Sequence, residues 1–426
     1  MAETALTPAL APADRARILF YCGAIIVALN FVSPAAGVLV IPLSFVLKNK
    51  LHLSANDVAM FTLWAGIPGY LAFAFGMVRD FWSPFGLGDR GYFILFGTLA
   101  AVLLVVFAFL GVSQAMLLVS VLQFTVCFLF MWGAWNGLGA IVGQRHAMSG
   151  QISALWNFAG TLAIVAALFL GGVLSQYLEG MSAAGAIRTL FLLLAGVMAA
   201  IAALGLWKPK ALSADLARGG ERPDIMADIS RLARHWPIYP ALTIWMLWNF
   251  SPGTLTALQY YMSDTLHASD SQWGAYNAIS YATSVPAFVA FGFLSSRFSL
   301  RALLWWGAAL GVMQMLPLLL VHSAVGALIA AAPIGLIGGL ATAAYMDLLI
   351  RACPKGMEGT MMMMAWSLFA LSVNGGNLWG TDLYDRHGGF VACVIATTIV
   401  YALILPVLLL VPKKLIATAD GTVLAA

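Results

Sequence analysis

The chain has 426 residues, of which 62% are hydrophobic and 9% are charged. A soluble domain is usually about half apolar and about a quarter charged, so this composition excludes an ordinary soluble protein and predicts an all-α membrane protein. The formal net charge of +4 is carried mostly between the apolar segments, which argues for membrane topology and against a nucleic-acid-binding surface.

Twelve apolar segments long enough to cross a bilayer follow one another. The predicted spans are about 18–47, 57–78, 91–111, 115–143, 151–177, 186–206, 238–262, 272–295, 300–321, 324–350, 358–384 and 388–411. A charged loop, the one clear linker, separates the first six from the last six. The predicted units are a tail, a six-helix half, the central loop, a second six-helix half and a second tail: 1–17, 18–207, 208–237, 238–411 and 412–426.

The basic residues predict the orientation. With the N-terminus inside, 17 of the 21 Lys and Arg residues fall on the inner side. Those left outside are Lys48, Lys50, Arg188 and Arg386. Because cytoplasmic loops are enriched in Lys and Arg, we expect twelve spans, both termini in the cytoplasm, and a multi-pass protein of the cell inner membrane.

The stretch Gly76–Tyr92, between the second and third spans, holds the four charged residues Arg79, Asp80, Asp89 and Arg90. Its Gly, Pro and paired charged residues predict a tight, hydrogen-bonded turn and not a spanning helix. Because this turn falls on the Arg-rich inner side, we interpret it as the inner gate of the first half.

A weaker copy of this turn follows the eighth span, at Gly292–Arg301, where Ser296 replaces the acid. Two parallel six-helix halves with a charged turn at the same place describe the layout of the major facilitator superfamily. Gly76, Asp80 and the Gly88-Asp89-Arg90 tripeptide also resemble the signature turn of that superfamily.

A narrower resemblance, to the folate–biopterin transporter family, rests on three stretches. They are Pro42–Ser54, Ser251–Leu266 and Cys353–Thr360, the last followed by Asn374 and Gly375. The Cys-Pro-Lys-Gly-x-Glu-Gly-Thr pattern in the third stretch is the most specific. This resemblance implies a folate- or pteridine-like solute.

Polar and Trp residues within the spans are candidates for solute binding, since polar groups in a bilayer are costly unless they are paired or wet. Indoles can stack on a flat heteroaromatic ligand, and amides can pair with its edge. The alternative is that these residues make helix–helix hydrogen bonds and interfacial belts. The candidates are Asn30, Gln123, Trp132, Trp135, Asn136, Gln151, Trp156, Asn157, Trp248, Asn249, Tyr276, Asn277, Tyr281, Trp366, Asn374 and Asn377.

Asp347 is the clearest acid within a span and is the candidate for proton coupling, because a carboxyl in a low dielectric can bind and release a proton. The alternative is an ion pair with Arg351, four residues further on. For the inner gate we expect Arg79, Asp80, Asp89 and Arg90 to act with Arg145 or with a helix N-terminus. Glu358 fits either a first-turn helix cap or a second gate contact.

These features predict a secondary active transporter that moves a small organic solute by alternating access, with H⁺ as the expected coupling ion. One alternative keeps the fold and changes the solute to a metal chelate, a nucleoside-like or an amino-acid-like compound. Another is a non-transporting membrane sensor, against which the lack of a large soluble domain argues.

Enzyme activity, a cofactor and a bound metal are not expected. The sequence has no phosphate-binding Gly loop with Lys-Ser/Thr, and its His residues have no metal-ligand spacing. The expected partners are the solute, H⁺ and the lipid bilayer, with no nucleic acid, and the expected state is a monomer.

Overall fold

The computed structural model describes residues 11–53, 55–207, 225–268, 270–386 and 388–419. These residues form helices and turns, and no strand occurs among them. Eight helical segments of the described chain are long and apolar enough to cross a membrane. The prediction of an all-helical membrane protein is therefore confirmed. Parts of the predicted tails and central loop lie outside the described residues.

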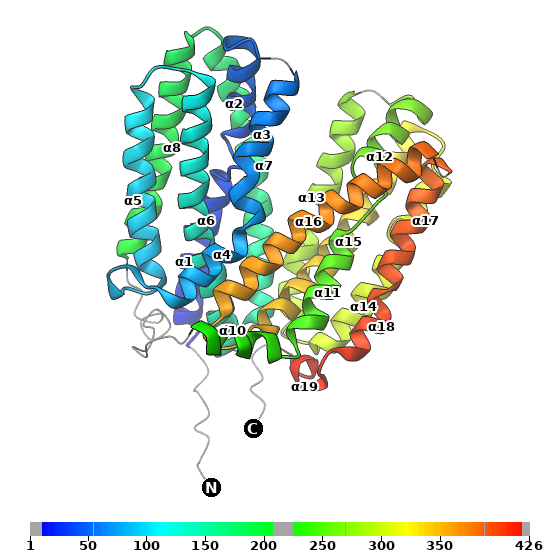
Figure 1. Cartoon of the computed structure of the whole chain (residues 1–426). Coiled ribbons are helices and arrows are strands. Elements are labelled where there is room, and N and C mark those ends of the chain that lie inside the picture. Colours follow the sequence, from blue (N-terminus) through cyan, green and yellow to red (C-terminus); the bar gives the residue numbers. More distant parts are fainter. Residues whose placement is uncertain (1–10, 54, 208–224, 269, 387, 420–426) are drawn as a thin grey trace.

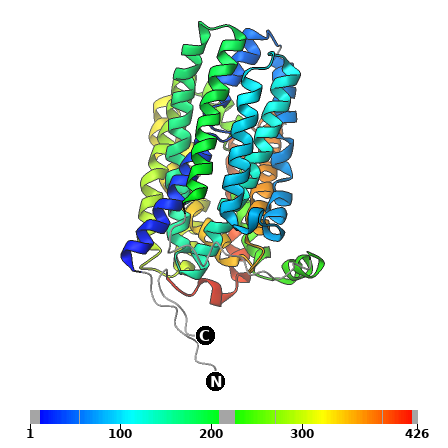
Figure 2. The same cartoon turned by 90° about the vertical axis from the view of Figure 1, so that its left-hand side faces the viewer.

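The first group of helices runs from the N-terminal end to residue 206. Its members are α1 (Pro12–Phe31), α2 (Val40–Phe45), η1 (Val46–Lys50), α3 (Ala55–Tyr70), α4 (Ala72–Phe81), η2 (Pro84–Gly86), α5 (Asp89–Ala108), α6 (Gln114–Arg145), α7 (Ser149–Glu179) and α8 (Ala183–Leu206). The amphipathic helix α10 (Ile225–Arg234) follows and lies beside one end of the bundle (Figures 1 and 2).

The second group begins at residue 238. Its members are α11 (Ile238–Asn249), α12 (Thr256–Tyr260), η4 (Tyr261–Thr265), α13 (Asp270–Leu294), α14 (Leu300–Met313), η5 (Leu316–Leu320), α15 (Ala324–Ala352), α16 (Glu358–Arg386), α17 (Gly389–Ala402), α18 (Ile404–Leu410) and α19 (Lys413–Ile416).

The two groups lie side by side and meet at one end only (Figure 1). We call the end that holds the α4–α5 turn, α10 and α19 the joined end. The ribbons of the two groups diverge toward the opposite end, which we call the open end (Figure 1). Most contacts between the groups come from α4 and α6 against α16 and from α7 against α13 and α15, with fewer from α6 against α15 and from α3 against α16. Helix α1 starts at the joined end, where α19 also lies (Figure 2).

Two predicted spans contain a long break in the structure, whereas the breaks between α3 and α4, α14 and η5, and α17 and α18 span only one or two residues. The first span breaks between Phe31 and Val40, and the seventh between Asn249 and Thr256. Each long break contains a Ser-Pro pair. Proline supplies no backbone N–H and disfavours helical geometry in the residue before it, so a helix tends to stop at such a pair.

The stretch Gly76–Tyr92 is only partly the turn that we predicted. Helix α4 continues to Phe81, and α5 already starts at Asp89, so the turn proper occupies residues 82–88. The prediction failed for the first residues because Gly76 packs against Gly359 of α16, a tertiary contact that keeps α4 helical to its end.

Candidate functional site

At the joined end, Asp80 of α4 caps the N-terminus of α16. One carboxylate oxygen accepts a hydrogen bond from Gly359 N (3.0 Å), and the other accepts from Thr360 N (2.6 Å) and Thr360 Oγ1 (2.7 Å). The first turn of a helix carries unsatisfied N–H groups and a partial positive charge, so a buried carboxylate there is stabilised twice. This contact fastens the first helix group to the second.

Arg79 holds the capping acid in place. It donates from Nε and Nη2 to the two oxygens of Asp89 (2.6 and 2.5 Å) and from Nη1 to Asp80 (2.8 Å). All three side chains are buried. The guanidinium lies so close to Gly137 of α6 that a Cβ at that position would collide with it. We call Arg79, Asp80 and Asp89, together with Gly359 and Thr360, the latch.

Three other residues predicted for the inner gate make their contacts outside the latch. Arg90 donates to the carbonyl oxygens of Gly205 and Leu206 (2.9 and 2.8 Å), so it joins α5 to the end of α8 within the first group. Glu358 is the first residue of α16 and accepts from Gly356 N (3.0 Å) in the preceding turn, so its carboxylate lies at the helix N-terminus, where the helix dipole favours an acid.

Arg145 is exposed at the end of α6. Its neighbour Gln144, which the sequence analysis missed, makes the contact between the groups. Gln144 Nε2 donates to the carbonyl oxygens of Ile350 and Cys353, both at 2.7 Å. These carbonyls end α15, where backbone acceptors lack helical partners.

Asp347 is fully buried in α15 and forms a two-bond ion pair with Arg351 (2.8 and 3.2 Å). Arg351 also donates to Ser149 Oγ (2.9 Å) at the start of α7 and to Thr418 O (2.8 Å) near the chain end. Two parallel N–H donors of a planar guanidinium match the two oxygens of a carboxylate. The arrangement therefore has the geometry of the ion pair that we gave as the alternative to proton coupling.

Four tryptophans from three helices meet between the two groups. Trp132 and Trp135 of α6 contact Trp156 of α7, with ring centroids 5.8 and 4.7 Å apart, and Trp132 lies 5.4 Å from Trp366 of α16. We call these four residues the Trp cluster. Trp132 Nε1 is buried without a hydrogen-bond partner among the described residues. Such a donor is costly to leave unpaired, so it is available for a ligand.

The space beside the Trp cluster is small in this conformation. A void of only about 10 Å³ lies between Asn136, Trp156, Trp366 and the missed residue Trp245. That volume is about the size of one water molecule. A larger ligand enters here only if the helices on the two sides separate.

Residues 145–376, more than half of the chain, match the sequence model of the Major Facilitator Superfamily. The chain belongs to the Major Facilitator Superfamily. It is thus a multi-pass membrane protein of a family of secondary transporters. No curated protein matches it by sequence.

Solved structures of superfamily transporters share the fold. The transporter FucP in its outward conformation has a TM-score of 0.69 at 14% identity, over 93% of this chain and 98% of that one. The proton:xylose symporter XylE bound to 6-bromo-6-deoxy-D-glucose has a TM-score of 0.66 at 12% identity, over 95% and 98%. A bacterial homologue of the iron transporter ferroportin, in an outward-facing state, has a TM-score of 0.64 at 15% identity, over 92% and 98%.

Five of the candidate amides in this superfamily member are oriented by their own helices. In each one, Nδ2 donates to the carbonyl oxygen four residues earlier, at 2.7–2.9 Å. They are Asn30, Asn136, Asn157, Asn249 and Asn277. One N–H of each amide is therefore used within the helix, as in the helix-packing alternative, and Nδ2 of Asn136 also contacts Met363 Sδ of α16 (3.9 Å).

The remaining candidates in the first group and on α16 are dispersed. Gln123 Nε2 donates to Cys127 Sγ (3.2 Å), and Gln151 accepts from Arg15 Nε (2.7 Å). Asn377 accepts from Thr256 N (3.1 Å) and so supports the start of α12, while Asn374 is exposed.

The aromatic candidates of the second group lie apart from the Trp cluster. Trp248 donates to Thr342 Oγ1 (2.9 Å) and stacks on Tyr401. Tyr276 stacks on Trp273, and Tyr281 is exposed. The structure therefore brings together Trp132, Trp135, Asn136, Trp156 and Trp366, but not the other predicted solute-binding residues.

The two interrupted helices are copies of one another, which the sequence analysis missed. Asn30-Phe31 before Ser33-Pro34 corresponds to Asn249-Phe250 before Ser251-Pro252. Each break is followed by a short helix and a π-helical turn, η1 or η4. His52 and His267 then adopt the same left-handed backbone, with φ of 54° and 50°. The repeated Asn-Phe and Leu-His pairs were the signal that could have revealed this.

Proposed function

We propose that the protein is a secondary active transporter that moves a small organic solute across the cell inner membrane by alternating access. One observation supports this best. The latch fastens the two helix groups at the joined end through the N-terminus of α16, while their ribbons diverge toward the open end (Figure 1). A contact that closes one side while the other is open is what alternating access requires.

We assign the joined end to the cytoplasm, because the Arg-rich turns and both ends of the described chain lie there. If each interrupted helix counts as one crossing, the two groups supply six crossings each. Twelve crossings with both termini in the cytoplasm follow, and the two helix groups then diverge toward the outside (Figure 1).

The resemblance to the folate–biopterin family gives the solute class, a pteridine or folate-like compound. The Trp cluster supports a flat ring, since indole faces stack on aromatic rings. Two of the similar structures are described as a xylose symporter bound to a glucose derivative and as a homologue of an iron transporter. A solute of a different class, such as a metal chelate, is therefore the competing proposal.

Coupling to H⁺ is part of the proposal, and one of the similar structures is a proton:xylose symporter by its title. Asp347 remains the candidate from the sequence, although its bidentate pair with Arg351 favours a structural role. If Asp347 carries the proton, its replacement leaves exchange intact and abolishes accumulation driven by a gradient. If it is structural, both activities fall together.

The test is uptake by purified protein in liposomes under an imposed pH gradient, with labelled biopterin and labelled folate. We expect accumulation of at least one compound above its equilibrium level, and we expect Asp347→Asn to lower exchange and accumulation in parallel. If neither compound is taken up, with or without a gradient, the pteridine proposal is contradicted. Normal exchange without accumulation in Asp347→Asn contradicts the structural role.

A further inference from the structure

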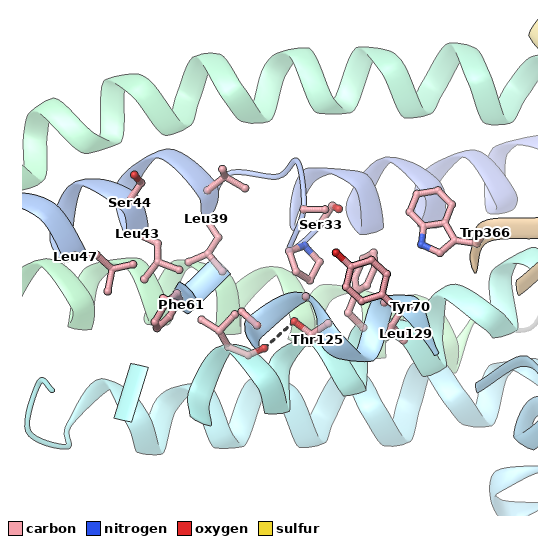
Figure 3. A pocket seen from close by; sticks show the side chains of 18 residues that line it. Ser33, Leu39, Leu43, Ser44, Leu47, Phe61, Tyr70, Thr125, Leu129 and Trp366 are labelled. Atoms are coloured by element: carbon pink, nitrogen blue, oxygen red, sulfur yellow. Dashed lines mark hydrogen bonds between the residues drawn. The ribbon is translucent and has the colours of Figure 1, made fainter. Parts of the chain in front are cut away.

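A cavity of about 430 Å³ lies inside the first helix group (Figure 3). Helices α2, α3 and α6 line it, together with η1 and the break between α1 and α2, and Trp366 of α16 lies at one end. Small-molecule sites usually have volumes of roughly 300–1,000 Å³, so this one is large enough for a ring compound. Of the predicted solute-binding residues, only Trp366 lines it.

The lining is uncharged and mostly apolar. None of its 18 side chains carries a charge or an amide. A charged ligand group here would lose its water without gaining a counter-charge, which is unfavourable. The cavity therefore selects for uncharged groups.

The hydroxyl groups of the lining are not evenly spread. Ser33, Tyr70 and Thr125 lie toward the Trp366 end, whereas Ser44 is the one hydroxyl residue of the lining that lies at the other end, beside Leu43 and Leu47 (Figure 3). Thr125 Oγ1 donates to Val121 O (2.8 Å), so toward a ligand this hydroxyl acts as an acceptor. The Trp366 end thus offers an aromatic face beside a small set of hydroxyls.

The position of the cavity connects it with both helix groups. Ser33 lies in the break between α1 and α2, and irregular backbone within a membrane is tolerated where it lines a cavity. Trp366 belongs to the Trp cluster and to the helix that the latch fastens. A ligand bound next to Trp366 would therefore contact both helix groups. A lipid acyl chain could occupy the cavity by contacting the first group alone.

We propose that this cavity receives the uncharged part of the transported solute, a flat ring with hydrogen-bonding groups on its edge. The inference rests on the proposed function. The ring face packs on Trp366, and its edge groups meet Ser33, Tyr70 and Thr125. A carboxylate of the solute stays outside the cavity, which favours a neutral pteridine over the carboxylate-bearing end of a folate.

The test uses matched pairs of probes on the purified full chain in lipid nanodiscs. Each pair has one neutral and one carboxylate member: 6-hydroxymethylpterin with pterin-6-carboxylate, and indole-3-ethanol with indole-3-acetate. We expect the neutral members to raise the thermal unfolding midpoint by roughly 2 °C or more at saturating concentration, and the carboxylates to have at most half that effect. 1-Octanol is the probe for a simple alkyl chain.

Two variants fill the cavity from different walls, Ala65→Phe on α3 and Leu129→Phe on α6, so that a folding defect in one leaves the other usable. Both should abolish the shift caused by the neutral probes. Ala199→Phe, at an exposed position of α8, is the matched control and should preserve it.

Three results would overturn the inference: no shift with either neutral probe, a shift that survives both filling variants, or an equal shift with the carboxylates or with 1-octanol. Failure of the proposed function looks different, because it appears as absent liposome uptake while the cavity-dependent shift persists. Uptake without any cavity-dependent shift contradicts the cavity assignment alone.

Discussion

Among single residues, Asp80 makes three hydrogen bonds from the first helix group to α16 at the joined end. Its two oxygens satisfy two backbone N–H groups and one hydroxyl of α16, and Arg79 fixes the same carboxylate from the side. The acid could be predicted from the sequence, because a charged residue in such an apolar chain needs a partner. The identity of the partner could not, since Gly359 lies 279 positions away.

Asp80→Asn should loosen the latch. The amide retains one acceptor but loses the charge that the helix N-terminus stabilises, at a cost of about 1–2 kcal/mol. Cys353, in the turn between α15 and α16, reports the opening. Burial, with Glu358 and Asp80 acting in the same direction, raises the pKa of its thiol well above the usual value, so the closed protein presents little thiolate.

We therefore expect maleimide labelling of Cys353 at pH 7.5 to become roughly 5- to 30-fold faster in Asp80→Asn, which corresponds to that free energy. The background replaces the other buried cysteines: Cys22→Ser, Cys127→Ser and Cys393→Ser. Asp385→Asn, at an exposed site near the other end of α16, is the control and should leave the rate unchanged. Equal rates in all three proteins would show that Asp80 does not hold this end closed.

At the scale of helices, the crossing of α4 and α16 sets how closely the groups approach. A Cβ on Gly76 would collide with the carbonyl oxygen of Gly359 and lie 2.8 Å from Met363 Cβ. Gly196 of α8 has no neighbouring atom within 4 Å of such a Cβ. Replacing each of these two glycines by alanine separates the effect of crowding, which only Gly76 has, from the effect of helix propensity, which both share.

Gly76→Ala should lower the thermal unfolding midpoint and speed Cys353 labelling, because the added methyl group pushes α16 away. Gly196→Ala should be neutral or raise the midpoint, since Ala in a helix is favoured over Gly by about 0.5–1 kcal/mol. A midpoint for Gly76→Ala at or above that of Gly196→Ala would mean that the crossing tolerates the methyl group.

The helices themselves follow from the sequence to differing degrees. Long apolar runs identify α5, α6, α7, α8 and α15 directly, because hydropathy depends on local composition. The interruptions at Pro34 and Pro252 carry a local signal that a search for continuous spans passes over. No local sequence signal marks Gln144 or Trp245, since their hydrogen-bond partners lie on helices distant in the sequence.

For the whole molecule, some features can again be predicted from local sequence, whereas others depend on distant contacts. Composition and basic-residue counts predict a membrane transporter fold, and the superfamily match agrees. The convergence of Trp132, Trp156 and Trp366 depends on the angle between the two groups, which no local pattern encodes. That angle is also what transport must change.

If the groups rock as two bodies, loosening the joined end must bring the open ends together. Spin labels at the exposed residues Asn49 in η1 and Thr265 in η4 report the open end. Labels at the exposed residues Phe85 and Lys355 report the joined end. In Asp80→Asn, pulsed electron paramagnetic resonance should show a shorter component at the open end and a longer one at the joined end, in equal fractions. A latch worth 1.4 kcal/mol shifts the ratio of the two states about tenfold. Asp385→Asn should leave both distributions unchanged. A change confined to one end would exclude rigid rocking and leave local movement of the interrupted helices as the transport motion.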